Sequence, residues 1–312
     1  MQKIGRIAIT GPTGAVGIAI IKQMIAQNVE VLAICNPQSH RNKHIPDNPL
    51  VKLIPCDLSH LNELTKQTLP PCDIFYHLGW GGTIGNGRND MRLQTQNIMN
   101  SLNAVELAKH LECHTFIGAG SQAEYGRFNG VLQPETPVNP ETGYGIAKLC
   151  AGKMTRIKCS QMGLRHIWIR ILSVYGPYDG PDTLVMSMID KLSAGIVPQT
   201  TPGEQLWDYL YSGDAANAFY LAGKCGKDGA VYCLGQGIAY PLKDYIMTIR
   251  EITAPEMDVA IGAIPYSSNQ VMHLCADISA LQNDTGFAPA TSFSDGIRKT
   301  LLWYNKERGD VK

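Results

Sequence analysis

The sequence predicts an α/β fold, a doubly wound parallel sheet with helices on both faces, followed by a smaller, mixed C-terminal region. In the first half, short apolar runs typical of buried strands alternate with segments whose apolar residues recur at helical spacing. Such alternation favours a parallel sheet, because each helix can connect two strands that run in the same direction. The predicted strands are Lys3–Thr10, Val29–Ile34, Leu50–Pro55, Ile74–Leu78, Thr115–Ala119 and Ile167–Leu172. The predicted helices are Gly14–Gln27, Leu61–Lys66, Asp90–His110 and Tyr144–Met162.

This alternation ends near Gly176, which divides the sequence into two regions. Residues 1–176 form the predicted sheet region, and residues 177–312 form a looser region expected mainly to cover a ligand. Proline and glycine interrupt the second region at positions 177, 180, 181, 195, 198, 202 and 203. Short apolar segments such as Val231–Leu234 are candidates to return to the main sheet, so the boundary is not a clean division.

Bulk composition restricts the partners and the compartment. Lys plus Arg and Asp plus Glu number 27 each, so the formal net charge is zero. Nucleic acids and anionic membranes bind basic surfaces, and neither is expected as a partner. The nine cysteines include no Cys-x-x-Cys spacing, so we expect reduced thiols and no metal site. No apolar run could span a bilayer, and Met1–Thr10 is interpreted as a strand and not a signal peptide, which predicts a cytoplasmic protein.

Three glycines, Gly11, Gly14 and Gly17, follow the first predicted strand and open the first predicted helix. Glycine lets a pyrophosphate approach the backbone, and the N–H groups at a helix N-terminus attract its negative charge. A plain strand–helix turn is the alternative, but the position of this loop favours a Rossmann-like dinucleotide site within residues 1–176. The residues expected to contact the dinucleotide here are Gly11, Thr13, Gly14, Ala15, Val16 and Gly17.

The segment after the second strand bears on which dinucleotide binds. An acid at this place holds the ribose 2′-hydroxyl of NAD and repels the 2′-phosphate of NADP. Residues 34–41 contain no acid and offer Asn36, Ser39 and Arg41, and arginine suits phosphate as a planar charged fork. A solvated basic loop is the alternative. We predict NADP(H) as the cofactor.

A Tyr-x-x-x-Lys motif, Tyr144 and Lys148, provides a candidate acid–base pair. Residues four apart share one face of a helix, and an ammonium beside a phenol lowers the pKa of the phenol. We expect Tyr144 to exchange a proton and Ser121, at the end of the strand before it, to bind the substrate oxygen. A turn serine is the alternative for Ser121. A second copy of the motif, Tyr220 and Lys224, follows no such strand and is interpreted as structural.

The glycine spacing, Ser121 and the Tyr-x-x-x-Lys motif resemble, in this order, the extended short-chain dehydrogenase/reductase family. Within it they resemble the branch of nucleotide-sugar epimerases, dehydratases and reductases. The resemblance implies that Asp57 and Leu58 contact the adenine, and that Leu78 and Gly79 pass beside the nicotinamide ribose. It also implies that Lys148 holds that ribose.

The segment after Ser121 departs from part of this branch. Sugar-nucleotide 4,6-dehydratases carry an acid two residues before a Tyr-Gly pair, where this sequence has Ala123. Glu124 is displaced from that position by one residue, which normally turns a side chain elsewhere. Epimerase–reductases of the fucose type carry a catalytic cysteine at the same place. We therefore predict hydride transfer alone, as in reductases of nucleotide-linked 4-keto-6-deoxyhexoses of the CDP-abequose synthase type.

Five residues are expected to contact such a substrate: Trp80, Gln122, Glu124, Ser173 and Trp207. The two tryptophans could stack on a sugar or base, and structural packing is their alternative role. Family members usually carry Asn where Ser173 stands and Arg where Trp207 stands. The predicted substrate is a nucleotide sugar, and its diphosphate is expected to be held in a different way from that usual in the family.

Three alternatives to the reductase stay open. A nucleotide-sugar 4-epimerase would use the same Ser, Tyr and Lys with a tightly bound cofactor. A reductase of another carbonyl compound and a non-catalytic NADP(H)-binding module are the others. For assembly we predict a homodimer that pairs the helices at 90–110 and 144–162, with apolar positions such as Ile98, Leu102 and Val105 at helical spacing.

Overall fold

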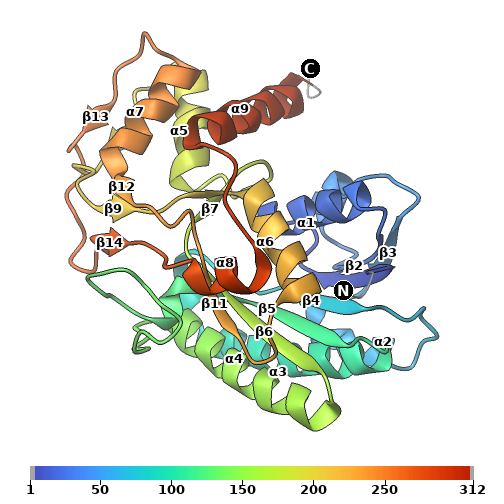
Figure 1. The fold of residues 1–312 in the computed structure, drawn as a ribbon. Coiled ribbons are helices and arrows are strands. Elements are labelled where there is room, and N and C mark those ends of the chain that lie inside the picture. Colours follow the sequence, from blue (N-terminus) through green and yellow to red (C-terminus); the bar gives the residue numbers. More distant parts are fainter. Residues whose placement is uncertain (1–3, 310–312) are drawn as a thin grey trace.

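The structure, a computed structural model, describes residues 4–309, and its centre is a seven-stranded parallel sheet (Figure 1). The strand order is β11-β6-β5-β4-β1-β2-β3, and every neighbouring pair is parallel. The strands are β1 Arg6–Thr10, β2 Glu30–Cys35, β3 Val51–Pro55, β4 Ile74–His77, β5 Thr115–Ser121, β6 Arg165–Ile171 and β11 Val231–Leu234. The predicted α/β class with a Rossmann-like sheet is confirmed.

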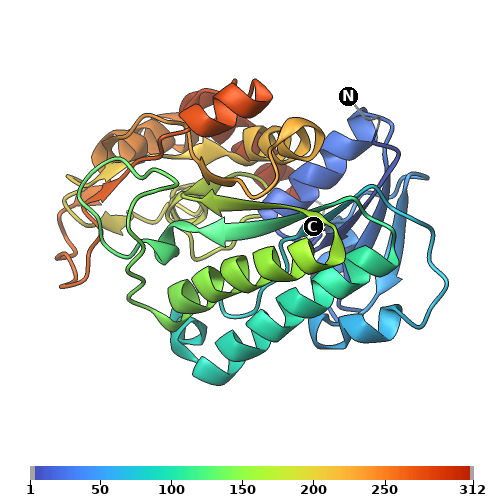
Figure 2. The same cartoon turned by 60° about the horizontal axis from the view of Figure 1, so that its bottom comes forward.

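Helices cover both faces of the sheet (Figure 2). Along β1, Ile7 and Ile9 belong to one apolar core and Ala8 to the other. Burial on both faces explains why the strands are near-continuous apolar runs in the sequence. One face carries α2 (Leu61–Leu64), α3 (Met91–His110) and α4 (Gly143–Met162); the other carries α1 (Ala15–Ala26) and α6 (Ser212–Cys225).

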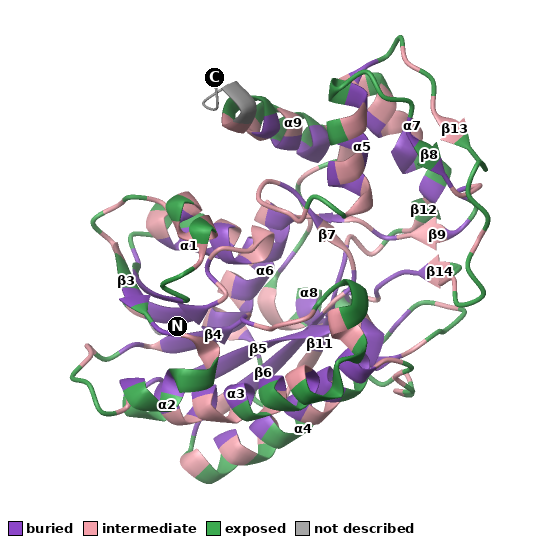
Figure 3. Ribbon diagram, turned by 180° about the vertical axis from the view of Figure 1, so that it is seen from behind, coloured by how far each residue is buried: buried purple, intermediate pink, exposed green. Residues whose placement is uncertain are grey.

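The C-terminal region has its own apolar core and several two-residue strands (Figure 3). Its helices are α5 Leu184–Ser193, α7 Leu242–Thr253, α8 Ser279–Thr285 and α9 Phe293–Gly309. β7 (Val174–Tyr175) pairs with β10 (Leu210–Tyr211), and β8 (Gln199–Thr200) pairs with β13 (Ala260–Ile261). β9 (Leu206–Trp207) pairs with β12 (Tyr240–Pro241) and β14 (His273–Leu274). Between residues 4 and 309, no helix has both the length and the apolar character that a membrane crossing requires.

Segments of the C-terminal half also take part in the main layers. β11 is the edge strand beside β6, as the apolar run at 231–234 suggested, and α6 packs beside α1. Four 3-10 helices lie in the loops: η1 His40–His44, η2 Leu58–His60, η3 Gly85–Asn89 and η4 Gln122–Glu124. Residues 177–309 therefore complete the sheet and also contribute to the cleft at its carboxyl edge.

The element ends place the candidate catalytic residues. β5 continues two residues beyond the predicted Ala119, so Ser121 is its last residue. Thr142 caps α4, because its hydroxyl accepts a hydrogen bond from the Gly145 N–H at 3.1 Å. Tyr144 and Lys148 consequently lie in the first two turns of α4.

Candidate active site

A cleft of about 310 Å³ opens at the carboxyl edge of the sheet. It is formed by the β1–α1 loop, the segments after β4, β5 and β6, and the first turns of α4. The predicted residues that line it are Gly11, Gly14, Ala15, Val16, Gly17, Leu78, Trp80, Ser121, Tyr144 and Lys148. Thr83, Leu172 and Asp179 also line it and were not predicted.

The glycine loop has the shape that a dinucleotide pyrophosphate requires. Gly11 has a φ of 70°, and a Cβ there would lie 2.7 Å from the backbone nitrogen of Gly79. Only glycine fits between these two segments. Gly14 begins α1 without a side-chain cap, so N–H groups of the first helical turn are left for an anion in the cleft. Thr13 lies in the same loop but not among the residues that line the cleft.

The structure brings Ser121, Tyr144 and Lys148 together, and each is at most 9% exposed. The Lys148 ammonium donates a hydrogen bond to the backbone oxygen of Ala119 at 2.7 Å. The Ser121 hydroxyl accepts one from the Ala123 N–H at 3.2 Å. The arrangement therefore combines two hydroxyl groups and one ammonium in a small, mostly buried space.

Burial dominates the protonation of this group. Burial raises the pKa of Tyr144, while a hydrogen bond with Ser121 and the Arg88 guanidinium act in the opposite direction. Burial lowers the pKa of Lys148 to about 7, and the Glu124 carboxylate opposes this fall. Lys148 lies 5.8 Å from the centre of the Tyr144 ring. The expected lowering of the Tyr144 pKa by Lys148 is not seen here, and Tyr144 is a protonated phenol.

Trp80 forms a fixed wall beside the catalytic group. The Lys148 ammonium lies 3.8 Å from the centre of the Trp80 ring, and the indole meets the Tyr144 ring edge-on with centroids 6.2 Å apart. Its N–H donates to Gln94 Oε1 at 2.9 Å. Gln94 is itself buried and donates to the backbone oxygens of Gly82 and Gly87. The tryptophan proposed as a substrate contact is thus anchored by a polar network.

Arg88 is the second cation of the site, and sequence reasoning missed it. Its guanidinium carbon lies 4.5 Å from the centre of the Tyr144 ring, and it donates to the backbone oxygen of Thr83 at 2.9 Å. Arg88 lies on η3, in a loop that has neither helical nor strand periodicity. No sequence signal distinguishes it from a solvated surface arginine.

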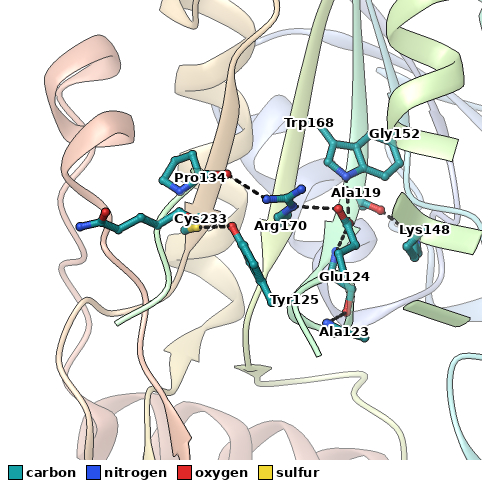
Figure 4. A network of polar contacts seen from close by, with 12 residues as sticks. Ala119, Ala123, Glu124, Tyr125, Pro134, Lys148, Gly152, Trp168, Arg170 and Cys233 are labelled. Carbon is teal, nitrogen blue, oxygen red and sulfur yellow. Dashed lines mark hydrogen bonds and ion pairs between the residues drawn. The ribbon is translucent and has the colours of Figure 1, made fainter. Parts of the chain in front are cut away.

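Glu124 does not face the cleft, although it was predicted as a substrate contact. It is 1% exposed, and its carboxylate accepts from Trp168 Nε1 at 2.9 Å and from Arg170 Nε at 2.8 Å (Figure 4). A third donor is the backbone N–H of Ser121, at 2.9 Å. The prediction of substrate contact is corrected on this point, because a carboxylate with three protein donors is part of the core.

The residues expected at the adenosine end lie in two groups. Asn36 donates to the Asp57 carboxylate at 3.0 Å, so an acid does stand beside the end of β2, contributed by the loop that follows β3. Leu58 packs against Gly79, where a Cβ would collide with its methyl groups. Further out, the Ser39 hydroxyl accepts from the Arg41 N–H at 3.4 Å, and the Arg41 guanidinium donates to the backbone oxygen of Tyr178 at 2.6 Å.

The remaining candidates lie at the rim of the cleft or away from it. Trp207 Nε1 donates to the Ser173 hydroxyl at 3.0 Å, so these two predicted substrate contacts form a pair. Gln122 is half-buried in η4, directly after Ser121. Tyr220, from the second copy of the Tyr-x-x-x-Lys motif, lies on α6 and donates to Gln27 at 3.3 Å. It is not among the residues that line the cleft.

Comparison with known proteins identifies relatives of this architecture. A dTDP-glucose 4,6-dehydratase from Neisseria meningitidis is 25% identical over 96% of this chain and 93% of its own. One from Escherichia coli is 31% identical over 55% of this chain and 51% of its own. Among solved structures, a UDP-N-acetylglucosamine 4-epimerase from Methanobrevibacter ruminantium has 22% identity and a TM-score of 0.88, covering 98% of this chain and 100% of its own. A Streptomyces venezuelae dTDP-glucose 4,6-dehydratase solved with NAD has 18% identity and a TM-score of 0.85, covering 97% and 98%.

The structural likenesses concern the fold, whereas a family match covers most of the chain. Residues 7–235 match the family described as the NAD dependent epimerase/dehydratase family. These residues include the glycine loop, Ser121 and the Tyr144–Lys148 pair. The chain therefore belongs to the NAD dependent epimerase/dehydratase family.

Proposed function

We propose that this protein reduces the ketone of a nucleotide-linked sugar, at C4 of a 4-keto-6-deoxyhexose, with a nicotinamide cofactor. The observation that carries the proposal is the position of Glu124. Dehydration needs a base that removes a proton next to the ketone, but the acid nearest the catalytic serine is held in the core by Arg170. The two residues between Ser121 and Glu124 are Gln122 and Ala123, which are not acids. Hydride transfer needs only the Ser121, Tyr144 and Lys148 group.

The chain's own residues orient the substrate and the cofactor and supply the proton for the ketone oxygen. A bound nicotinamide supplies the hydride when it lies in the cleft. Tyr144 then gives its hydroxyl proton to the oxygen of the former ketone, which becomes an alcohol. Ser121 donates a hydrogen bond to the same oxygen, so charge that develops there meets a donor already in place. Lys148 holds the cofactor ribose and provides a positive charge to the tyrosinate that remains.

A nucleotide-sugar 4-epimerase is the second candidate, supported by family membership and by fold likeness to 4-epimerases. To invert C4, a sugar must present both faces of that carbon to one hydride position. Trp80 stands against Lys148 and Tyr144 and is anchored through Gln94, and we expect this fixed wall to restrict such a turn. This restriction supports one-way reduction.

We further propose NADPH as the cofactor, on the strength of Arg41. A guanidinium has five N–H donors, and the hydrogen bond to Tyr178 uses one of them. Arg41 and Ser39 lie together on and before η1, beyond the Asn36–Asp57 pair. Hydrogen bonds from Ser59 lower the pKa of Asp57, so this carboxylate is charged and opposes a phosphate beside Asn36. The 2′-phosphate must then be bound on the Arg41 side.

The first prediction tests the reaction. With a nucleotide-linked 4-keto-6-deoxyhexose, NADPH should be consumed one for one with alcohol formed, measured by reduced-nicotinamide absorbance and by mass spectrometry of the sugar. Interconversion of C4 epimers without net cofactor use would replace this function with the epimerase. Release of water from a nucleotide-linked hexose would replace it with a dehydratase.

The second prediction assigns the proton donor. Tyr144→Phe should lower the turnover rate by about 10²–10⁴-fold, because the ring stays and the acid is lost, while cofactor affinity changes little. Lys148→Ala should lose both turnover and cofactor affinity. Tyr220→Phe is the matched control and should keep its rate. An inactive Tyr220→Phe beside an active Tyr144→Phe would reverse the assignment.

The third prediction concerns Arg41. Arg41→Ala should weaken NADPH binding by about 1–3 kcal/mol through the lost charged hydrogen bond, and leave NADH binding unchanged. Titration calorimetry with each cofactor measures both affinities. Lys43→Ala, which removes an exposed charge from the same 3-10 helix, is the control. Equal losses for both cofactors, or tighter NADH binding by the parent protein, would contradict NADPH specificity.

The fourth prediction is a homodimer through α3 and α4. These helices lie side by side, and Met99, Ile146, Met154 and Ile157 on them are 40–61% exposed. Val105, expected at this interface, is instead fully buried in the chain's own core. Light scattering at micromolar concentration should give the dimer mass for the parent and the monomer mass for Ile157→Glu. Leu302→Glu on α9 should remain dimeric; a monomeric parent protein would contradict the proposal.

A further inference from the structure

The buried carboxylate of Glu124 links the catalytic serine to β6. One oxygen, Oε1, accepts from the Ser121 N–H and from Trp168 Nε1, each at 2.9 Å. The other oxygen, Oε2, accepts from Arg170 Nε at 2.8 Å. Figure 4 shows the Glu124, Trp168 and Arg170 side chains gathered near Ala119, whose backbone oxygen accepts a hydrogen bond from Lys148. The carboxylate therefore lies between the backbone of the catalytic serine and an arginine that is 5% exposed.

The sequence around Glu124 makes room for this arrangement. Gly120 precedes the serine, and a Cβ there would lie 2.6 Å from Glu124 Oε1. The Trp168 indole lies in a slot between Gly118, Gly120 and Gly152, each of which would collide with the indole if it carried a Cβ. A buried carboxylate is tolerated only where charge and hydrogen bonds compensate its lost hydration. Here Arg170 supplies the charge and two N–H groups supply the rest.

We propose that Glu124 is a positioning residue of the active site, which fixes Ser121 through its backbone and supplies the negative charge behind Lys148. The proposal rests on the Ser121, Tyr144 and Lys148 group of the proposed function, but not on the identity of the sugar. Ser121 is the last residue of β5, so the Glu124 contact holds the point where strand becomes loop. A small shift at this point would move the Ser121 hydroxyl away from the reacting oxygen.

The electrostatic part of the proposal depends on the charged groups around Lys148. Tyr144 lies on the same helix, Arg88 contacts Tyr144 from η3, and Arg170 faces Glu124 from β6. His77, on β4, is uncharged at neutral pH, because burial and then Lys148 lower its pKa to about 3. Glu124 thus supplies the negative charge that acts on Lys148 and raises its pKa, against the larger effect of burial.

Loss of the Glu124 charge should shift the loss of activity to lower pH. Lys148 acts as an ammonium, so its contribution is lost as pH rises through its pKa. Without the Glu124 charge that pKa falls further, and the loss begins at lower pH. Glu124 also raises the pKa of Tyr144, so the tyrosine proton would likewise be lost at lower pH. The changes in the pKa of Lys148 and of Tyr144 therefore both move the alkaline limb of the activity profile to lower pH.

The main test is Glu124→Gln, which keeps an oxygen acceptor for Ser121 and Trp168 and removes the charge. The alkaline limb of kcat/KM should move by about one unit to lower pH. Glu30→Gln, which breaks an exposed ion pair with Arg6 at the amino end of β2, should leave the profile unchanged. A lower rate with an unmoved profile would mean that Glu124 only supports the fold, and would overturn the electrostatic part.

Glu124→Gln leaves Arg170 buried without its partner, so a second variant guards against loss of folding. Glu124→Gln combined with Arg170→Met removes both charges and keeps the acceptor for Ser121. Since Glu124 is the group whose charge raises the pKa of Lys148, the double variant should show a limb displaced in the same direction. An unmoved limb in the double variant would mean that the effect does not come from the Glu124 charge.

The backbone part is tested through Ser121. Glu124→Leu should lower kcat by about tenfold to a hundredfold with KM little changed. In a Ser121→Ala background the same substitution should cost little more, because the residue it positions is already gone. Equal losses in both backgrounds would show that Glu124 does not act through Ser121.

A substrate-independent measurement separates this inference from the proposed function. Binding of NADPH, followed by its fluorescence, should weaken as pH rises, with a midpoint that is lower in Glu124→Gln than in the parent. If no keto-sugar is turned over but this midpoint moves, the proposed reaction fails and the role of Glu124 stands. If a keto-sugar is reduced and neither midpoint nor activity profile moves, the role of Glu124 as a charge partner fails.

Discussion

Parallel strand pairing is the constraint on which the whole site depends. The register places Thr10 beside His77, His77 beside Gly118, and Ser121 beside Ile171, so β1, β4, β5 and β6 end at one edge. The glycine loop and the Trp80 wall follow the ends of β1 and β4, and the catalytic serine is the last residue of β5. Because parallel strands must be joined by crossovers, segments far apart in sequence meet at this edge, as Gly11 and Gly79 do.

Much of this geometry could be predicted from the sequence, because it depends on local spacing and strand order. The glycine loop, Ser121 at a strand end and the Tyr144–Lys148 pair are all of this kind. What could not be predicted depends on contacts between distant residues. The partner of Asn36 is Asp57, in the loop after β3. The indole N–H of Trp80 donates to Gln94, on a helix after an irregular loop. Without the fold, neither pairing has a sequence signature.

Glu124 shows how one position alters the chemistry available to a site. A 3-10 helix has three residues per turn, so successive side chains point about 120° apart. In η4 this rotation leaves Gln122 half-exposed and turns Glu124 toward β6. An acid one residue earlier would project in another direction, which fits the interpretation that its displacement removes a base from the cleft. A dehydratase would need this carboxylate as a base in the cleft. Here the carboxylate instead stabilises the backbone around Ser121.

The slot around Trp168 has a consequence for how this sequence can diverge. A side chain at Gly118, Gly120 or Gly152 requires a smaller residue at 168, and a smaller residue there leaves a cavity and an unsatisfied Glu124 oxygen. These four positions are therefore expected to change together among descendants of this chain. In a set of related sequences, their co-variation would record the presence of the buried tryptophan even where the catalytic residues are identical.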